Sequence, residues 1–263
     1  MTRRTLLQAL GGAPPAFAQS HPTIPVQALN HMTLLVTDVA RSLRFYQQLF
    51  GIPVQARQGP TVLLRIATGP QFIALHPAGR NQSPAIGHFC VATEPFDVDA
   101  VTRTLVQSGA NKPRVRMRAA DLGGAPNGTP ELYFADPDGL SVQIQHTSYC
   151  GGAGALGEQC PPQVEPSQFK GFLTPRSFDH FLLHVSDEER SRAFYRSLFG
   201  EFSGIAFARE PKPAIAHACL TVERFDANRA LSALTELGVR RNIRINGAGV
   251  TFPDPDGIRI RLV

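Results

Sequence analysis

The sequence predicts an α+β fold in which tandem β-α-β-β-β modules form two domains, the second of them shortened. The first observation is a repeat, because residues 30–51, NHMTLLVTDVARSLRFYQQLFG, return as residues 179–200, DHFLLHVSDEERSRAFYRSLFG. The second is a shared Asp-Pro-Asp-Gly turn at residues 136–139 and 254–257. A fixed repeat of a whole strand and helix indicates duplicated structural units.

Each copy of the repeat predicts a strand, a turn and a helix. In the first copy, residues 31–36 are apolar and rich in β-branched side chains, which favours a strand. Asp38 stands where an N-cap would begin the helix, and Gly51 stands where positive φ would end it. We interpret the Phe-Tyr pair of each helix, at residues 45–46 and 194–195, as helix core.

The first domain is expected over residues 29–147. Its first strand and helix are followed by short apolar runs near 53–56, 62–66 and 72–75. A second strand at 86–91 and a helix over 96–108 precede three strands near 114–118, 131–134 and 140–145. The predicted order is therefore β-α-β-β-β, twice over.

The second domain is expected over residues 177–263 as a shorter copy. His88 and His217 begin matching segments, but they are 217 − 88 = 129 residues apart, whereas the first strands are 149 apart. The difference, 149 − 129 = 20 residues, is missing between the two strand-helix units. We therefore expect most of the middle strands of that module to be absent.

Residues 148–176 are predicted to be a Gly- and Pro-rich linker. Two of the four cysteines, Cys150 and Cys160, lie inside it and suggest a disulfide that closes a short loop. On the loop-entropy model such a bridge contributes about 2–3 kcal/mol. The other pairing, Cys90 with Cys219, stays open, because four cysteines allow three full connectivities.

Residues 1–20 are predicted to be an export signal of the twin-arginine type. Residues 2–8, TRRTLLQ, carry the arginine pair, and residues 16–18, AFA, supply a small-residue cleavage site. The protein is thus expected to be periplasmic or secreted, with an unexported N-terminus as the alternative. No apolar run approaches the roughly 20 residues that a membrane span needs.

The charge argues for small partners. The formal net charge is +5, and removal of Arg3 and Arg4 with the signal would leave 5 − 2 = +3. No zinc-finger spacing or basic stretch interleaved with aromatic residues accompanies it, so we expect no nucleic-acid partner. The expected partner is a small molecule, with a small anion as the narrower expectation.

The first-strand histidines, the Phe-Tyr-x-x-Leu-Phe-Gly helices and the Asp-Pro-Asp-Gly turns together resemble the vicinal oxygen chelate superfamily. That superfamily includes glyoxalase I, extradiol dioxygenases and bleomycin-resistance proteins. The resemblance implies two glyoxalase-like domains whose sheets each curl into a cup. The two-residue period of the strands agrees and directs these side chains toward the first cup: His31, His88, Cys90, Gln143 and Gln145.

The resemblance also implies a metal site in the first cup. Members of the family hold a divalent ion with a histidine on the first strand of each module and a carboxylate seven residues beyond the first Asp of the turn. Here these positions are His31, His88 and, since 136 + 7 = 143, Gln143. Two histidines and an oxygen ligand suit Fe, Zn, Ni or Mn, although the carboxylate is absent.

The second cup departs further from the family pattern. Its corresponding positions are His180, His217 and, since 254 + 7 = 261, Arg261. A guanidinium has no lone pair to offer a cation, so this cup cannot repeat the first site. Arg259 shares the face of Arg261, and the two form either an anion-binding cup or a salt-bridged face against the first domain.

The leading functional hypothesis is an exported, divalent-metal-dependent enzyme of the lyase, isomerase or dioxygenase type. Its substrate would be small with vicinal oxygens, and the second domain would close the cup. Candidate substrate-binding residues are Cys90, Gln145, His180, His217, Arg259 and Arg261, and no catalytic acid or base is identified. The alternative is a metal-free protein that sequesters a small molecule. The chain is expected to be a monomer or a homodimer.

Overall fold

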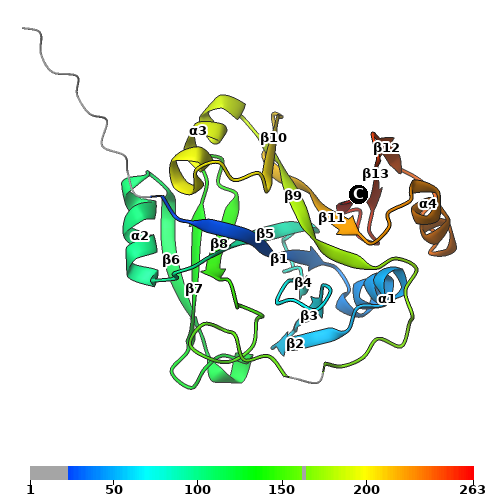
Figure 1. Cartoon of the computed structure of the whole chain (residues 1–263), viewed down its shortest axis with the longest axis horizontal. Coiled ribbons are helices and arrows are strands. Elements are labelled where there is room, and N and C mark those ends of the chain that lie inside the picture. The colour runs from blue at the N-terminus through cyan, green and yellow to red at the C-terminus, as the bar shows by residue number, and fades with distance from the viewer. Residues whose placement is uncertain (1–22, 162–163) are drawn as a thin grey trace, which may run out of the picture.

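The computed structural model describes residues 23–161 and 164–263 (Figure 1). The export signal predicted for residues 1–20 lies outside these residues. In the part of the chain that is described, no helix is both long and apolar enough to cross a membrane.

The first domain contains two complete β-α-β-β-β modules in one eight-stranded sheet. The first module comprises β1 (Val26–Val36), α1 (Val39–Phe50), β2 (Val54–Gln58), β3 (Thr61–Arg65) and β4 (Phe72–Pro77). The second comprises β5 (Ala85–Thr93), α2 (Val98–Gln107), β6 (Asn111–Arg118), the 3₁₀ turn η1 (Ala120–Leu122), β7 (Thr129–Ala135) and β8 (Ser141–His146). The strand order is β2-β3-β4-β1-β5-β8-β7-β6, so the first strands of the modules are neighbours at the centre.

The second domain is the same unit with one hairpin missing. Its elements are β9 (Pro175–Val185), α3 (Glu188–Phe199), β10 (Ile205–Arg209), β11 (Ala214–Val222), α4 (Ala227–Glu236), β12 (Arg244–Asn246), β13 (Gly249–Pro253) and β14 (Arg259–Leu262). The sheet order is β10-β9-β11-β14-β13-β12. Strand β10 pairs in parallel with β9, as β4 pairs with β1, so the β2–β3 hairpin has no counterpart. The predicted tandem modules and shortened second domain are confirmed.

The four α-helices within residues 23–161 and 164–263 each begin at an aspartate whose carboxylate accepts a backbone N–H of the first turn. In α1, Asp38 accepts from the amide of Arg41 at 3.0 Å, and Gly51 ends the helix at φ 67°. Asp97, Asp187 and Asp226 cap α2, α3 and α4 in the same way. These caps satisfy N–H groups that have no partner within the helix.

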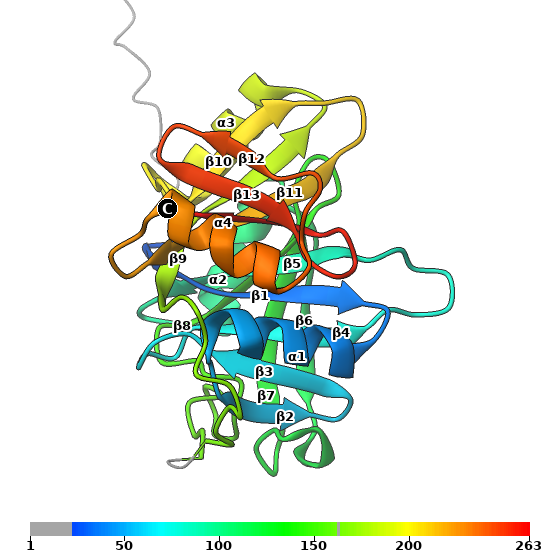
Figure 2. The ribbon, with the colours of Figure 1, turned by 90° about the vertical axis from the view of Figure 1, so that its right-hand side faces the viewer.

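The two domains share one apolar core. Phe89 of β5 stacks on Phe181 of β9, with ring centroids 4.9 Å apart. Helix α1 packs on β3 and β4 of its own sheet (Figure 2), and its Phe45 ring also lies 6.4 Å from that of Phe252 in β13 of the other domain. Phe194 of α3 likewise lies 6.2 Å from Phe134 in β7 of the first domain. Each sheet therefore turns its apolar face toward the other domain and its cup away. The expectation that the second domain closes the first cup is wrong, because that domain covers the opposite face.

The repeated Asp-Pro-Asp-Gly turns also join the domains. The second aspartate of one turn, Asp256, accepts from the Thr37 amide at 3.1 Å and pairs with Arg41 at the start of α1. Reciprocally, Asp138 accepts from the Ser186 amide at 3.1 Å and pairs with Arg190 at the start of α3. Each turn thus holds the first turn of a helix in the opposite domain.

Candidate metal centre

A cavity of about 450 Å³ occupies the cup of the first domain. Its base is formed by β1, β5 and β8, which are adjacent in the sheet. Its wall is formed by β3, β4, β6 and β7 together with Tyr149 of the linker. Within the described chain, all of its lining residues come from the first domain and this first part of the linker.

The three predicted ligands meet at the base of the cavity. His31 on β1 and Gln143 on β8 both lie opposite Cys90 of β5, and His88 lies two residues before Cys90. His31 Nε2 is 3.0 Å from Gln143 Oε1 and 3.4 Å from His88 Nε2. Ligands about 2.1 Å from one ion, at tetrahedral to right angles, would be separated by roughly 3.0–3.4 Å. The donor atoms therefore already stand at ligand-to-ligand spacing.

The hydrogen bonds behind His31 determine which ring nitrogen carries its proton. Asn30 Nδ2 donates to the carbonyl of Tyr149 at 2.9 Å, so its Oδ1 faces His31 Nδ1, 2.8 Å away. Nδ1 must then donate, which leaves the lone pair on Nε2. That lone pair faces the amide oxygen of Gln143, whose own Nε2 is buried without a hydrogen-bond partner. A cation between these acceptors satisfies both, so the residues present fit a metal.

Burial keeps the two cavity-base histidines neutral. Burial and the neighbouring His88 lower the pKa of His31 well below its usual value, against a smaller opposing effect of Gln143. Burial likewise lowers the pKa of His88 to about 4. Neutral imidazole is the form that binds metals, so neither residue needs to lose a proton at neutral pH.

A buried carboxylate, Glu131 of β7, also faces the cavity, and the sequence analysis missed it. Arg118 Nε donates to it at 2.7 Å, Arg116 pairs with it, and the hydroxyls of Tyr149 and Tyr133 donate at 2.9 and 3.2 Å. Burial raises its pKa, but the two guanidiniums outweigh burial and the net pKa is lowered. Glu131 is therefore ionised and fully engaged. Its sequence signal was the set of alternating arginines on the neighbouring strand.

The cavity wall is cationic. Arg114, Arg116 and Arg118 alternate along β6, and all three line the cavity with Glu131, which gives a local balance of 3 − 1 = +2 before any metal is added. The guanidinium of Arg114 lies over the ring of Tyr133, 5.0 Å from its centroid. No described carboxylate forms an ion pair with Arg114. This wall favours an anionic ligand.

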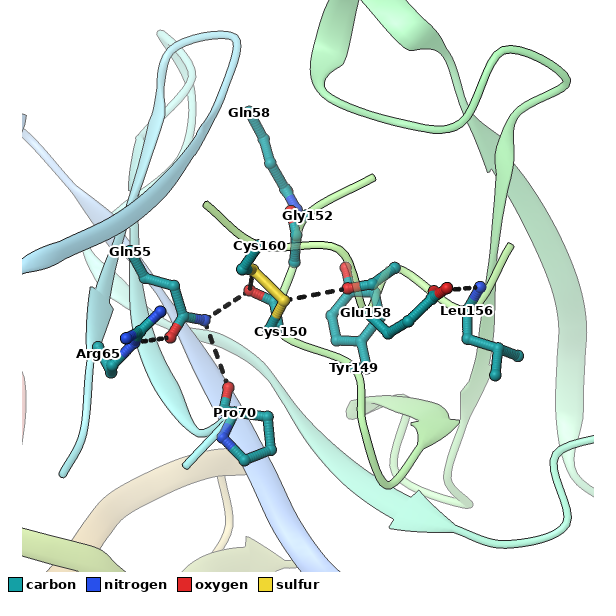
Figure 3. Close-up of a disulfide and its surroundings, with 12 residues drawn as sticks. Gln55, Gln58, Arg65, Pro70, Tyr149, Cys150, Gly152, Leu156, Glu158 and Cys160 are labelled. Carbon is teal, nitrogen blue, oxygen red and sulfur yellow. Dashed lines mark hydrogen bonds between the residues drawn. A yellow bond between two sulfur atoms is a disulfide. The ribbon is translucent and has the colours of Figure 1, made fainter. Parts of the chain in front are cut away.

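The linker closes one end of the cavity, although the sequence suggested a simple spacer. Cys150 and Cys160 are joined by a disulfide, with Cα atoms 6.1 Å apart (Figure 3). Four side chains of the domain donate to carbonyls of the loop: Gln55 to Cys150 at 2.6 Å, Gln58 to Gly151 at 2.8 Å, Arg118 to Gly152 at 2.7 Å and Thr129 to Gly154 at 2.8 Å. Tyr149 stacks on His31, with centroids 5.6 Å apart.

The structure differs from expectation for Cys90 and Gln145. Both are fully buried, and neither lines the cavity. The Cys90 thiol donates to the Val91 carbonyl, and burial raises its pKa well above the ordinary value. Gln145 donates to the Pro130 carbonyl at 3.2 Å. The side chains of His31 and Gln143 lie over Cys90, and the linker closes the end of the cup near Gln145.

The second cup brings together its own predicted residues, away from the first cavity. The rings of His180 and His217 are 5.5 Å apart, and Asp179 Oδ2 is 2.6 Å from His180 Nδ1. Ligand atoms of Asp179, His180 and Cys219 lie within 4.8 Å of one another. Burial, followed by His180 and Arg261, lowers the pKa of His217 to about 4. The nearby Arg261 opposes a cation here.

The two arginines of the second cup stay within their own domain. Arg261 donates to the carbonyl of Asn246 at 2.8 Å and lies 3.4 Å from the hydroxyl of Thr251. Neither Arg259 nor Arg261 forms a salt bridge with a described residue of the first domain. Since neither they nor His180 and His217 line the first cavity, none of the four touches a ligand bound there.

Paired β-α-β-β-β modules whose sheets curl into cups define the class of glyoxalase-fold proteins. Residues 28–144 match the family model of the Glyoxalase/Bleomycin resistance protein/Dioxygenase superfamily. The first domain therefore matches this superfamily, also called the vicinal oxygen chelate superfamily.

Similar proteins span several activities. The glutathione transferase FosA of Serratia marcescens is 24% identical over 139 residues, which cover 51% of this chain and 91% of that protein. The 2,3-dioxygenase LapB from Pseudomonas sp. KL28 superposes with a TM-score of 0.70 at 16% identity, covering 92% of this chain and 93% of LapB. The Mn(II)-bound glyoxalase from Novosphingobium aromaticivorans gives 0.66 at 17% identity, covering 91% and 82%. At such identities the two structures show the fold alone.

Proposed function

We propose that the chain is an exported, divalent-metal-dependent enzyme that acts on a small anionic substrate with two neighbouring oxygens. The observation that carries the proposal is the convergence of His31 Nε2 and Gln143 Oε1 beside His88 Nε2 at ligand-to-ligand spacing. Family relationship supports it, because a FosA transferase, a 2,3-dioxygenase and an Mn(II)-bound glyoxalase are similar to this chain.

The residues of the chain would divide the work as follows. His31, His88 and Gln143 would hold the ion, which when bound supplies Lewis acidity to substrate oxygens. The rings of Phe72 and Tyr149 both pack against the His31 ring, with centroids 4.3 and 5.6 Å away. Because all three donors are uncharged, the site leaves the full positive charge of an ion available to the substrate.

The cationic wall supports an anionic substrate. Arg114 stands at the cavity wall without a carboxylate partner, whereas Arg118 and Arg116 are engaged by Glu131. A carboxylate or phosphonate group beside the chelating oxygens would therefore meet Arg114. We expect Arg114→Gln to weaken binding of a carboxylate-bearing catechol more than binding of catechol itself, in titrations followed by fluorescence. Equal losses for both ligands would contradict this assignment.

Metal analysis tests the central proposal. Protein purified without chelators should carry about one transition-metal ion per chain, and His88→Ala should lose it. His217→Ala is the matched control, since it removes the equivalent histidine of the second cup and should retain the ion. Metal-free wild-type protein that also fails to bind added Zn²⁺ or Mn²⁺ would overturn the proposal.

A metal-free binding protein is the competing function, and the amide at position 143, where the family pattern has a carboxylate, favours it. If the Gln143 amide is reversed, its Nε2 donates to His31 Nε2 and the site is satisfied without an ion. In that case the wild-type protein would bind anionic ligands through Arg114 with no metal and no turnover. Ligand binding that survives exhaustive chelation would therefore support this alternative.

Export rests on the arginine pair of residues 2–8 and is compatible with the disulfide, since disulfides persist in oxidising compartments. Expression in a bacterium with a twin-arginine system should place the mature protein in the periplasm. Replacing Arg3 and Arg4 by lysine should retain it in the cytoplasm. An unchanged distribution between the two fractions would exclude this route.

A further inference from the structure

A single chain of hydrogen bonds joins the disulfide-closed linker to the donor set. The Tyr149 carbonyl accepts from Asn30 Nδ2 at 2.9 Å, and Asn30 Oδ1 accepts from His31 Nδ1 at 2.8 Å. His31 Nε2 then faces Gln143. Asn30 is 1% exposed and His31 is 2% exposed, so water does not compete for these contacts.

We propose that the linker fixes the tautomer of His31 through Asn30, so that Asn30 is a positioning residue for the metal site. The amide of Asn30 has two unlike ends, an oxygen that accepts hydrogen bonds and an NH₂ group that donates them. If Asn30 turned by half a rotation, its NH₂ would face His31 Nδ1, which would then accept, and the proton would move to Nε2. A protonated Nε2 cannot bind a metal. The orientation of one amide therefore decides whether the site has its first ligand.

The linker holds the deciding carbonyl in place. The backbone just after Tyr149 is fixed by Gln55, Gln58 and Arg118, which donate to three successive carbonyls, and by the Cys150–Cys160 disulfide. Gly151 has a φ of 78°, and a Cβ there would collide with the side chain of Leu63. The loop therefore lies close against the sheet, and these hydrogen bonds and the disulfide hold it beside Asn30.

The second domain provides an internal comparison. Asp179 stands where Asn30 stands, and its Oδ2 is 2.6 Å from His180 Nδ1. Both oxygens of a carboxylate are acceptors, so its orientation needs no partner. Asp179 is correspondingly half-exposed. An asparagine in this position requires a fixed acceptor for its NH₂ group, and in the first domain the Tyr149 carbonyl supplies it.

Nitrogen-15 NMR of the imidazoles in metal-free protein tests the proposal directly, because the shifts of Nδ1 and Nε2 distinguish the tautomers. Wild-type His31 should be protonated on Nδ1. Asn30→Leu should move the proton to Nε2 in part or in full, whereas Asn30→Asp, which keeps an acceptor, should restore Nδ1–H. A wild-type His31 protonated on Nε2, or no change in Asn30→Leu, would overturn the proposal.

Metal affinity supplies a second readout. Loss of the partner of a metal-binding histidine typically weakens affinity 10–100-fold, so we expect that loss for Zn²⁺ in Asn30→Leu and its recovery in Asn30→Asp. Asp179→Leu is the matched control, which should leave both the His31 tautomer and the Zn²⁺ affinity unchanged. Equal losses in the two leucine variants would contradict a specific role for Asn30.

A second variant isolates the linker and leaves the buried Asn30 unchanged. Replacing both Cys150 and Cys160 by serine should free the loop and populate both His31 tautomers, with Asn30 intact. An unchanged His31 tautomer in this variant would show that the linker does not fix it. The proposal rests on the proposed function only for its consequence, which is metal binding. If no variant binds metal but the tautomers follow this order, the metal hypothesis fails and the positioning role stands.

Discussion

The hydroxyl of Tyr46 in helix α1 donates to Asp254 of the second domain at 3.1 Å, and both groups are buried. Its counterpart, Tyr195 in α3, donates to Asp136 of the first domain at 3.2 Å. Each acceptor is the first aspartate of an Asp-Pro-Asp-Gly turn. The two repeated motifs are therefore partners across the domain interface, once in each direction.

Removing either hydroxyl should weaken the interface. Tyr46→Phe and Tyr195→Phe keep the rings in place but deprive a buried carboxylate of one donor. A hydrogen bond to a charged group contributes about 1.5–3 kcal/mol, and we expect each variant to lose about that much unfolding free energy in urea denaturation. Because the two pairs do not touch, the double variant should show the sum. A loss below 0.5 kcal/mol, on the order of an exposed substitution, would contradict a structural role.

The buried turn aspartates should make stability depend on pH. Burial raises the pKa of Asp254 to about 6, and backbone and Tyr46 hydrogen bonds only partly oppose this. The folded state thus binds the proton of the Asp254 carboxyl more tightly than the unfolded state does. The stabilisation that results from this difference is complete below about pH 4 and is lost as pH rises through 6. Wild-type stability should fall relative to Asp254→Asn between pH 4 and 7, by at most about 3 kcal/mol. Parallel curves from urea titrations would refute this.

Restoring the carboxylate of the family should strengthen the metal site. Gln143→Glu adds an anionic oxygen where the amide oxygen now lies 3.0 Å from His31 Nε2. The cationic wall of the cavity favours the added charge, and metal affinity rises with the charge of the ligands, so we expect Zn²⁺ to bind on the order of tenfold more tightly. Calorimetry measures this. Gln145→Glu, on the same strand but away from the cavity, is the control that should not gain affinity.

The Glu131 network should be essential for the first domain. Glu131→Gln removes the charge that Arg118 and Arg116 share and leaves the buried Arg118 without an anionic partner. Breaking a buried ion pair by removing one partner costs about 3–5 kcal/mol. We expect a loss of that size in thermal and urea unfolding. Glu165→Gln, which breaks an exposed pair with Arg57, should change stability by less than about 1 kcal/mol.

Repetition in the sequence predicted the repeated modules. The resemblance to the superfamily implied that His31, His88 and Gln143 would meet, and the two-residue alternation of the strands agreed by placing them on one face. It did not predict the closing of the cup by the linker. Glycines such as Gly151 indicated a linker between the domains, but here glycine allows close approach to the sheet. Composition does not distinguish these two uses of glycine.

Long-range partners were also beyond the sequence. The turn aspartates carried an obvious local role, and Asp136 does accept from the amides of Asp138 and Leu140 at 2.9 and 2.8 Å. Their partners Tyr46 and Tyr195 lie in the other domain, and no spacing rule connects them. Glu131 escaped notice for the same reason, since only the folded sheet sets it against the arginines of β6.

The contacts of α1 and α3 with both domains make the two halves of the chain mutually dependent. Each helix packs on its own sheet and also against the other domain, so parting the halves would expose part of a core that both of them share. The molecule should consequently melt in one cooperative step despite its duplicated plan. A destabilising substitution in the C-terminal half would then unfold the N-terminal domain as well, and its cavity would lose any bound ligand although no residue that lines the cavity had changed.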